Sequence, residues 1–121
     1  MDIYADMFFN AMCANIHEWN KTWWYDSNGK RLERNKGELL MLIVSEISEA
    51  MEGERKDLMD DKLPNRKMVE VELADAIIRI CDYAGAFDLD LGGAIMEKLE
   101  YNKHREDHKP ENRAKMGGKK W

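Results

Sequence analysis

Four carboxylates stand inside otherwise apolar stretches of this chain, in two pairs with the same spacing. The first pair is Glu46 and Glu49, and the second is Glu72 and Asp75. Residues three apart on a helix are separated by about 60° of arc, so the members of each pair share one face. Two such helices packed side by side would bring all four carboxylates to one place.

The repulsion among four clustered carboxylates must be offset. The six repulsive pairs, at about 6 Å and an effective dielectric constant of about 20, cost together on the order of 15 kcal/mol. The net stability of a domain of this size is only about 5–15 kcal/mol. The carboxylates must therefore hold protons or bind a cation, and all-oxygen ligation favours Mg²⁺, with Mn²⁺ as the second choice. Because bound Mg²⁺ takes phosphate oxygens as further ligands, the pattern predicts metal-assisted phosphate chemistry if the two pairs face each other.

The elements that would position these residues are helices throughout. Apolar periodicity predicts an all-α fold with helices over residues 2–20, 36–56, 66–84 and 91–106. Helix-capping side chains are expected at Asn35 (with Glu38 at N3), Asn65 and Asp90, and Gly85 is expected to end the third helix. Residues 39–44 are all apolar, which predicts burial on more than one side of the second helix. Since one small chain has little interior, a bundle completed by a second subunit is the simplest solution.

Three further groups of residues have alternative interpretations. Tyr4, Met7, Phe8, Ala11, Met12, Ile16 and Trp19 recur at helical spacing and predict a core face, which leaves His17 as a solvent-exposed residue or a polar site candidate. Trp23 and Trp24, in the aperiodic segment 20–35, either close over the core or stack on a base. Lys98, Asn102 and Arg105 share one helix face and form either a phosphate-binding set or an ordinary solvated surface.

The third predicted helix carries a polar stripe among apolar neighbours. Glu72, Asp75, Arg79 and Asp82 fall within about 80° of arc. Arg79 is therefore a further polar site candidate.

Composition excludes several classes of protein. The 121 residues include 24 acidic and 19 basic side chains, a formal charge of -5, so stable nucleic-acid binding is not expected. Cys13 and Cys81 have no CxxC spacing and are interpreted as reduced core residues of a cytoplasmic protein. No apolar run reaches the roughly 18 residues of a membrane span. None of the three histidines follows a glutamate at the spacing of di-iron bundles, and no Gly-rich phosphate loop is present.

The order of the acidic pairs resembles a known signature. Glu46-x-x-Glu49, a gap of 22 residues, and Glu72-x-x-Asp75 are similar to the motif of the MazG-like all-α nucleoside triphosphate pyrophosphohydrolases. The segments Lys21–Asp26, Ser45–Ala50, Glu72–Ile80 and Lys98–Arg105 also resemble small phage and bacterial members. The chain differs from them in its tail, where residues 110–116 precede Gly-Gly-Lys-Lys-Trp.

The resemblance implies a single MazG-like domain over residues 1–106, a four- to five-helix bundle, followed by a polar tail at 107–121. It implies hydrolysis of a (deoxy)nucleoside triphosphate to the monophosphate and pyrophosphate, with Mg²⁺ on the four acidic residues and a homodimer or dimer of dimers. Lys98, Asn102 and Arg105 match the family's phosphate contacts, and Glu46 or Glu49 would act as general base. The alternatives are a non-catalytic helical dimerisation or adaptor module with exposed acidic pairs, and cleavage of a related pyrophosphate in a phosphorylated metabolite.

Overall fold

The computed structural model describes residues 4–105 and 109–119, and over these residues the fold is all-α, as the sequence predicts. Their helices, with a short 3-10 helix η1, are α1 (Ala5–Trp19), η1 (Lys21–Trp23), α2 (Lys36–Lys56), α3 (Met68–Ala86), α4 (Leu91–Lys103) and α5 (Pro110–Arg113). The chain divides into two compact units, residues 11–89 and residues 1–10 with 90–121. The two acidic pairs both belong to the first of these units.

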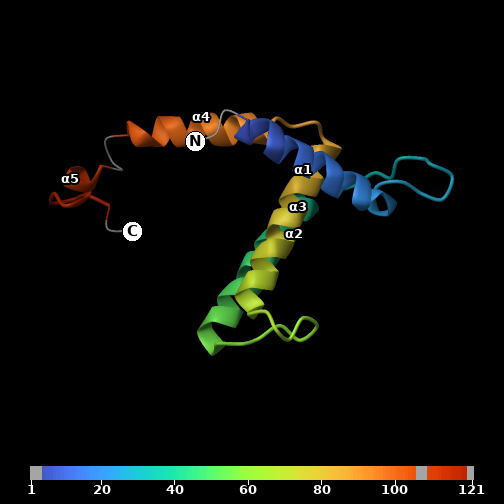
Figure 1. Ribbon diagram of the computed structural model, residues 1–121, viewed down its shortest axis with the longest axis horizontal. Coiled ribbons are helices and arrows are strands. Elements are labelled where there is room, and N and C mark those ends of the chain that lie inside the picture. The colour runs from blue at the N-terminus through green and yellow to red at the C-terminus, as the bar shows by residue number, and fades with distance from the viewer. Residues whose placement is uncertain (1–3, 106–108, 120–121) are drawn as a thin grey trace. The chain divides into compact units, whose positions relative to one another are not determined.

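Helices α2 and α3 form an antiparallel hairpin that is the centre of the 11–89 unit (Figure 1). The expected bounds of α2 are confirmed, and its N-cap is Asn35, whose side chain accepts a hydrogen bond from the Glu38 amide at 3.0 Å. The helices approach closely because the facing positions are small. Ala50 and Ala76 are buried, and a Cβ on Gly53 would lie only 2.9 Å from the Met68 side chain.

The start and end of α3 differ from the prediction. Asn65 does not cap it: the N-cap is Lys67, whose amide donates to Glu70 at 3.1 Å. An isolated bridge between Met59 and Lys67 keeps the backbone extended up to that point and delays the helix. Gly85 does not end α3 either, since the helix continues to Ala86.

Gly85 instead allows α1 to approach α3. A Cβ at this position would lie 2.6 Å from the His17 Cβ and 2.9 Å from the Cys13 carbonyl oxygen. Beside it, Cys13 and Cys81 are buried free thiols, which confirms the core assignment of both. Burial, followed by a hydrogen bond with Cys13, raises the pKa of the Cys81 thiol to about 12 and keeps it protonated.

The predicted core face of α1 is wrong for this chain. Most of its large side chains are exposed, from 46% for Met12 to 89% for Trp19, and Ile16 is half-buried. Helix α1 packs on α3 through the opposite, small-residue side, which carries Cys13 and His17. The periodicity located the helix correctly and identified the wrong face as buried, because close helix contact favours small side chains.

The unit formed by residues 1–10 and 90–121 contains α4 and α5. Asp90 caps α4, as predicted: its Oδ1 accepts hydrogen bonds from the Gly93 amide at 2.9 Å and from Asn10 at 2.7 Å. Gly92 passes against the α1 backbone at Asp6, where a Cβ would not fit. Helix α4 ends at Lys103, earlier than expected, and residues 106–108 of the predicted helix and tail lie outside the described residues.

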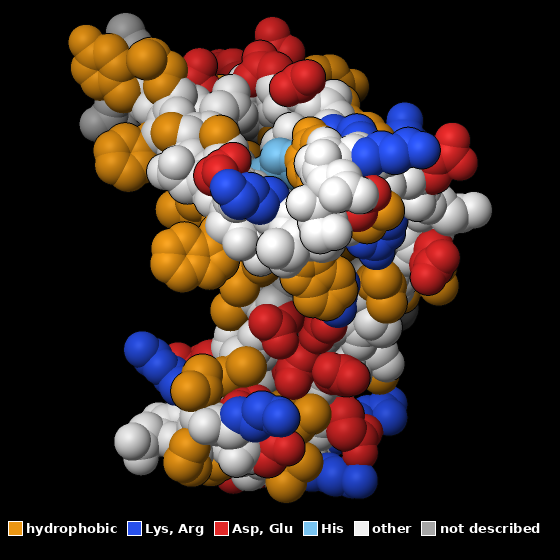
Figure 2. Space-filling model, turned by 90° about the vertical axis from the view of Figure 1, so that its right-hand side faces the viewer, with side chains coloured by type: hydrophobic (Ala, Val, Ile, Leu, Met, Phe, Trp, Pro, Cys, Tyr) orange, Lys and Arg blue, Asp and Glu red, His pale blue; other side chains and the backbone are white. Residues whose placement is uncertain are grey.

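Large apolar side chains remain exposed on α2. Those of Leu40, Met41, Val44, Ile47 and Met51 are 47–63% exposed and share an arc of about 120° that faces away from α3. Figure 2 shows hydrophobic side chains at the surface beside a group of carboxylates. Across the described ranges, no helix has both the length and the apolar character needed to cross a bilayer.

Candidate metal and phosphate site

Three of the four predicted carboxylates meet between α2 and α3. Oxygen atoms of Glu46, Glu72 and Asp75 all lie within 4.8 Å of one another. Glu46 is 8% exposed, and the other two residues are half-buried. Glu49 is exposed at the edge of the group and is not one of the three, although it lies within hydrogen-bonding reach of Glu72.

Glu72 is the most perturbed of these groups. Burial first, and then hydrogen bonds and repulsion involving Glu46 and Glu49, raise the pKa of Glu72 from 4.5 to about 8. Carboxylates only accept hydrogen bonds, so these contacts require that one member of the group carries a proton. The Oε2 atom of Glu72 is buried and receives no hydrogen bond from any described residue. At neutral pH this carboxyl group therefore holds a proton in the metal-free protein.

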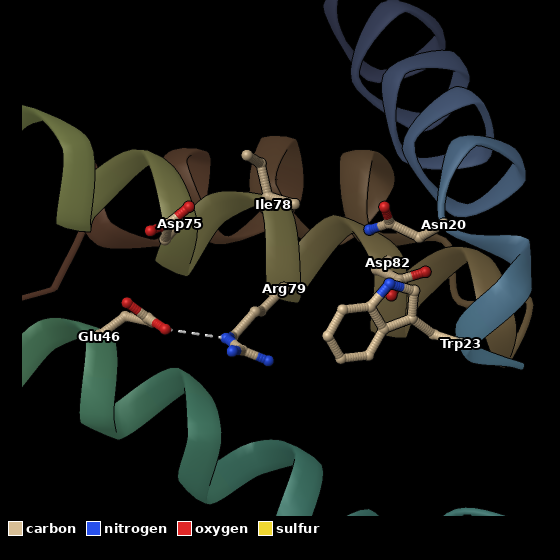
Figure 3. A pocket seen from close by; sticks show the side chains of 7 residues that line it. All are labelled: Asn20, Trp23, Glu46, Asp75, Ile78, Arg79 and Asp82. Carbon is tan, nitrogen blue, oxygen red and sulfur yellow. Dashed lines mark hydrogen bonds and ion pairs between the residues drawn. The ribbon is translucent and has the colours of Figure 1, made fainter. Parts of the chain in front are cut away.

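The other two carboxylates of the cluster, Asp75 and Glu46, both interact with Arg79. Burial, followed by repulsion from Glu46, raises the pKa of Asp75, and the nearby Arg79 guanidinium opposes that shift. Arg79 donates from Nε to Oε1 of Glu46 at 3.1 Å, across the α2–α3 interface (Figure 3). Among the described residues, Arg79 is the cation that pairs with the cluster.

A pocket of about 230 Å³ opens beside the cluster. Its lining residues are Asn20, Trp23, Glu46, Asp75, Ile78, Arg79 and Asp82. In Figure 3 the Trp23 ring and Asp82 lie on the far side of Arg79 from Glu46. The pocket thus joins a carboxylate end to an aromatic end, with a guanidinium between them.

The two adjacent tryptophans have different environments. Trp23 is 57% exposed and presents its ring to the pocket, so it keeps its place as a base-stacking candidate. Trp24 is 2% exposed, and its Nε1 donates to both oxygens of Asp82 at 3.0 Å. Trp24 is therefore a core residue that supports the pocket from behind.

His17 is not the solvated residue that its place on α1 predicts. Its Nδ1 lies 2.8 Å from Oδ1 of Asp82, and both side chains are at least four-fifths buried. The ring also meets Trp24 edge-on, with 5.4 Å between centroids. The predicted solvent exposure of His17 is wrong because helical periodicity shows only which side of α1 is polar. It does not show that α3 places Asp82 against that side. His17 does not line the pocket; it holds a residue that does.

Sequence reasoning missed three pocket residues, the apolar Ile78 and the polar Asn20 and Asp82. Asp82 shares the polar arc of α3 with Glu72, Asp75 and Arg79, so the signal was present. Asn20 follows α1 in an aperiodic segment, and no local pattern distinguishes it.

The predicted phosphate-contacting residues belong to the other unit. Lys98 and Asn102 lie on α4, where the Lys98 ammonium is 4.6 Å from the centre of the Tyr101 ring. The Asn102 Oδ1 atom is buried, and no described residue donates a hydrogen bond to it. Arg105 follows the end of α4.

The carboxylate cluster fits a divalent ion. It supplies three hard oxygen donors within 4.8 Å of one another, and Glu72, one of the three residues, has a buried oxygen that no donor among the described residues satisfies. No protein-family model matches the chain, and comparisons with curated proteins and with solved structures also find no match. The function of the protein is therefore inferred from the site itself.

Proposed function

We propose that this protein is a Mg²⁺-dependent nucleoside triphosphate pyrophosphohydrolase, which cleaves between the α- and β-phosphates. The observation that carries the proposal is the convergence of Glu46, Glu72 and Asp75 beside a pocket that ends at Trp23. A cluster that must hold a proton when empty gains most from a cation. An aromatic ring at the other end of the pocket provides a surface on which a nucleobase stacks.

Each residue then has a defined task. Glu46, Glu72 and Asp75 would hold the ion, with Mn²⁺ as a substitute for Mg²⁺. When bound, the ion would neutralise the triphosphate and activate a water. Glu49, the carboxylate outside the set of three, is exposed and would accept the water's proton. Lys98, Asn102 and Arg105 are assigned to the departing pyrophosphate only by the family resemblance.

The adaptor alternative fits less well. It requires acidic pairs that face solvent, whereas Glu46 is buried and Glu72 has a buried oxygen. Neither group would be placed there for solubility alone, because burying a carboxylate is unfavourable. The cytoplasmic location and the MazG-like bundle type remain part of the proposal.

We also propose a homodimer, or a dimer of dimers. The exposed apolar arc of α2 supports this, because five neighbouring aliphatic side chains on one helix face are stabilised when a second subunit covers them. Light scattering is expected to give a mass of two or four times 14.2 kDa.

The test is a screen of the eight common nucleoside triphosphates with Mg²⁺, with pyrophosphate and orthophosphate measured separately. At least one nucleotide should release pyrophosphate, and excess chelator should abolish the release. Glu46→Gln and Glu49→Gln should lower the rate at least about a hundred-fold, because each removes a ligand or a base. Glu52→Gln, an exposed position on the same helix paired with Lys56, is the matched control and should retain activity. Binding to a protein partner with no metal-dependent pyrophosphate release would favour the adaptor instead.

A further inference from the structure

Arg79 occupies the position between the carboxylates and the aromatic end of the pocket. It lines the main pocket with Glu46 and Asp75, and also a smaller adjoining hollow with Trp24. Its side chain is 34% exposed, whereas that of Glu46 is 11% exposed. Arg79 is therefore anchored at one end and accessible to a ligand at the other.

Among the described residues, only Glu46 accepts a hydrogen bond from Arg79. Nε bonds to Glu46, and no described residue accepts a hydrogen bond from either Nη atom. In Figure 3 one nitrogen of the Arg79 guanidinium extends away from Glu46 toward the Trp23 ring. A guanidinium presents its donors as a planar fork that matches two oxygens of one phosphoryl group. Arg79 thus lines the pocket with donors that Glu46 does not use, and at least one of them extends toward the aromatic end.

The Arg79–Glu46 pair also conflicts with metal binding. Glu46 is one of the three carboxylates within ligand distance of one another, and Arg79 already neutralises it. An ion bound by Glu46 competes with the guanidinium for the same carboxylate and repels it. The same repulsion favours a new anionic partner for Arg79 on the other side.

We propose that Arg79 exchanges partners: it neutralises Glu46 when the site is empty, and it binds phosphoryl oxygens of the substrate when the site is filled. The ligand class is a polyphosphate chain that extends from the carboxylate end toward Trp23. This inference rests on the proposed function for the claim that the polyphosphate belongs to a nucleotide. The competition between the metal ion and Arg79 for Glu46 does not require the protein to hydrolyse anything.

The exchange predicts that replacing Arg79 strengthens metal binding and weakens polyphosphate binding. Without Arg79 the metal meets no competing cation, so Arg79→Gln should bind Mn²⁺ about five-fold more tightly in the absence of nucleotide, the gain expected for removal of a partly exposed ion pair. The same variant should bind a polyphosphate roughly ten- to a hundred-fold more weakly, the loss expected for hydrogen bonds to a charged group. A purely structural role, in which Arg79 holds α2 against α3, would weaken both kinds of binding.

The experiment measures Mn²⁺ binding to the full chain by electron paramagnetic resonance without nucleotide. Binding of inorganic tripolyphosphate and of non-hydrolysable α,β-methylene nucleotides is then measured by calorimetry in the presence of Mg²⁺. Arg66→Gln is the matched control, because Arg66 forms an exposed pair with Glu70 at 3.4 Å away from the pocket. Arg79→Lys keeps the charge beside Glu46 but loses the fork, so it should bind Mn²⁺ like the wild type and tripolyphosphate more weakly.

Unchanged or weaker Mn²⁺ binding by folded Arg79→Gln would overturn the exchange, and so would undiminished tripolyphosphate binding. If Arg79→Gln does not fold, Arg79→Lys decides: tripolyphosphate affinity equal to that of the wild type refutes the proposal. Failure of the wild type to release pyrophosphate from any nucleotide would refute the proposed function instead, and the Mn²⁺ measurement would still test the exchange.

Discussion

Replacing Glu72 by glutamine is expected to stabilise the metal-free protein at neutral pH and to have a much smaller effect on its stability at pH 5. The folded protein raises the pKa of Glu72 to about 8, against 4.5 for the unperturbed group. A carboxyl group with a raised pKa contributes stability that is complete below about 4.5 and is lost as the pH rises through about 8. Glutamine resembles the protonated acid at every pH, so the variant does not lose this contribution.

The magnitude follows from proton linkage. Between the two pKa values the folded state binds one more proton than the unfolded state, so the free energy of unfolding falls by about 1.4 kcal/mol per pH unit. From pH 5 to pH 7 the wild type should lose about 2 to 3 kcal/mol relative to Glu72→Gln. For a chain of this length such a difference corresponds to about 10 °C in Tm.

The assay is urea unfolding in excess chelator at several pH values between 5 and 8, followed by far-ultraviolet circular dichroism. Titrating groups outside the carboxylate cluster cancel in the difference between the two proteins. Glu52→Gln is the control: Lys56 lowers the pKa of Glu52, so this group is ionised throughout the range and its substitution should add no pH dependence. A wild-type minus Glu72→Gln difference that stays flat from pH 5 to pH 8 would refute the reasoning, because Glu72 would then not be protonated and the cluster would not be as tight as described.

Two further predictions concern the support of the site. Gly85→Ala should destabilise the protein by about 1–3 kcal/mol, because its Cβ would lie 2.6 Å from the Cβ of His17 and α1 would have to move away from α3; a denaturation midpoint equal to that of the wild type would contradict the close packing. Asp82→Ala should cost about 1–3 kcal/mol by leaving the buried Trp24 Nε1 without an acceptor, whereas Asp82→Asn should cost less since it keeps one acceptor. The ranking of the two Asp82 variants by denaturation midpoint checks this second prediction, and equal effects would count against it.

Local sequence signals determined the all-α class, the bounds of α2 and its N-cap at Asn35. They also identified the carboxylates of the site, since i, i+3 spacing on a helix is a property of the backbone alone. Convergence of all four was predicted; three of them meet in the structure, and Glu49 is not one of the three. The pairing of α2 with α3 then required only that their small residues face each other.

What only the tertiary structure decided was which partner each side chain meets. The apolar stripe of α1 is exposed while its small-residue side packs on α3, and Gly85 serves that contact rather than a helix end. His17 and Asp82 are 65 residues apart in the chain, but their side chains come within 2.8 Å of each other. Glu46 and Arg79 are 33 residues apart, and their side chains come within 3.1 Å. Sequence periodicity gives the direction in which a side chain leaves its own helix. The atoms that this side chain contacts depend on how the helices cross, because the free energy of packing depends on both helix surfaces.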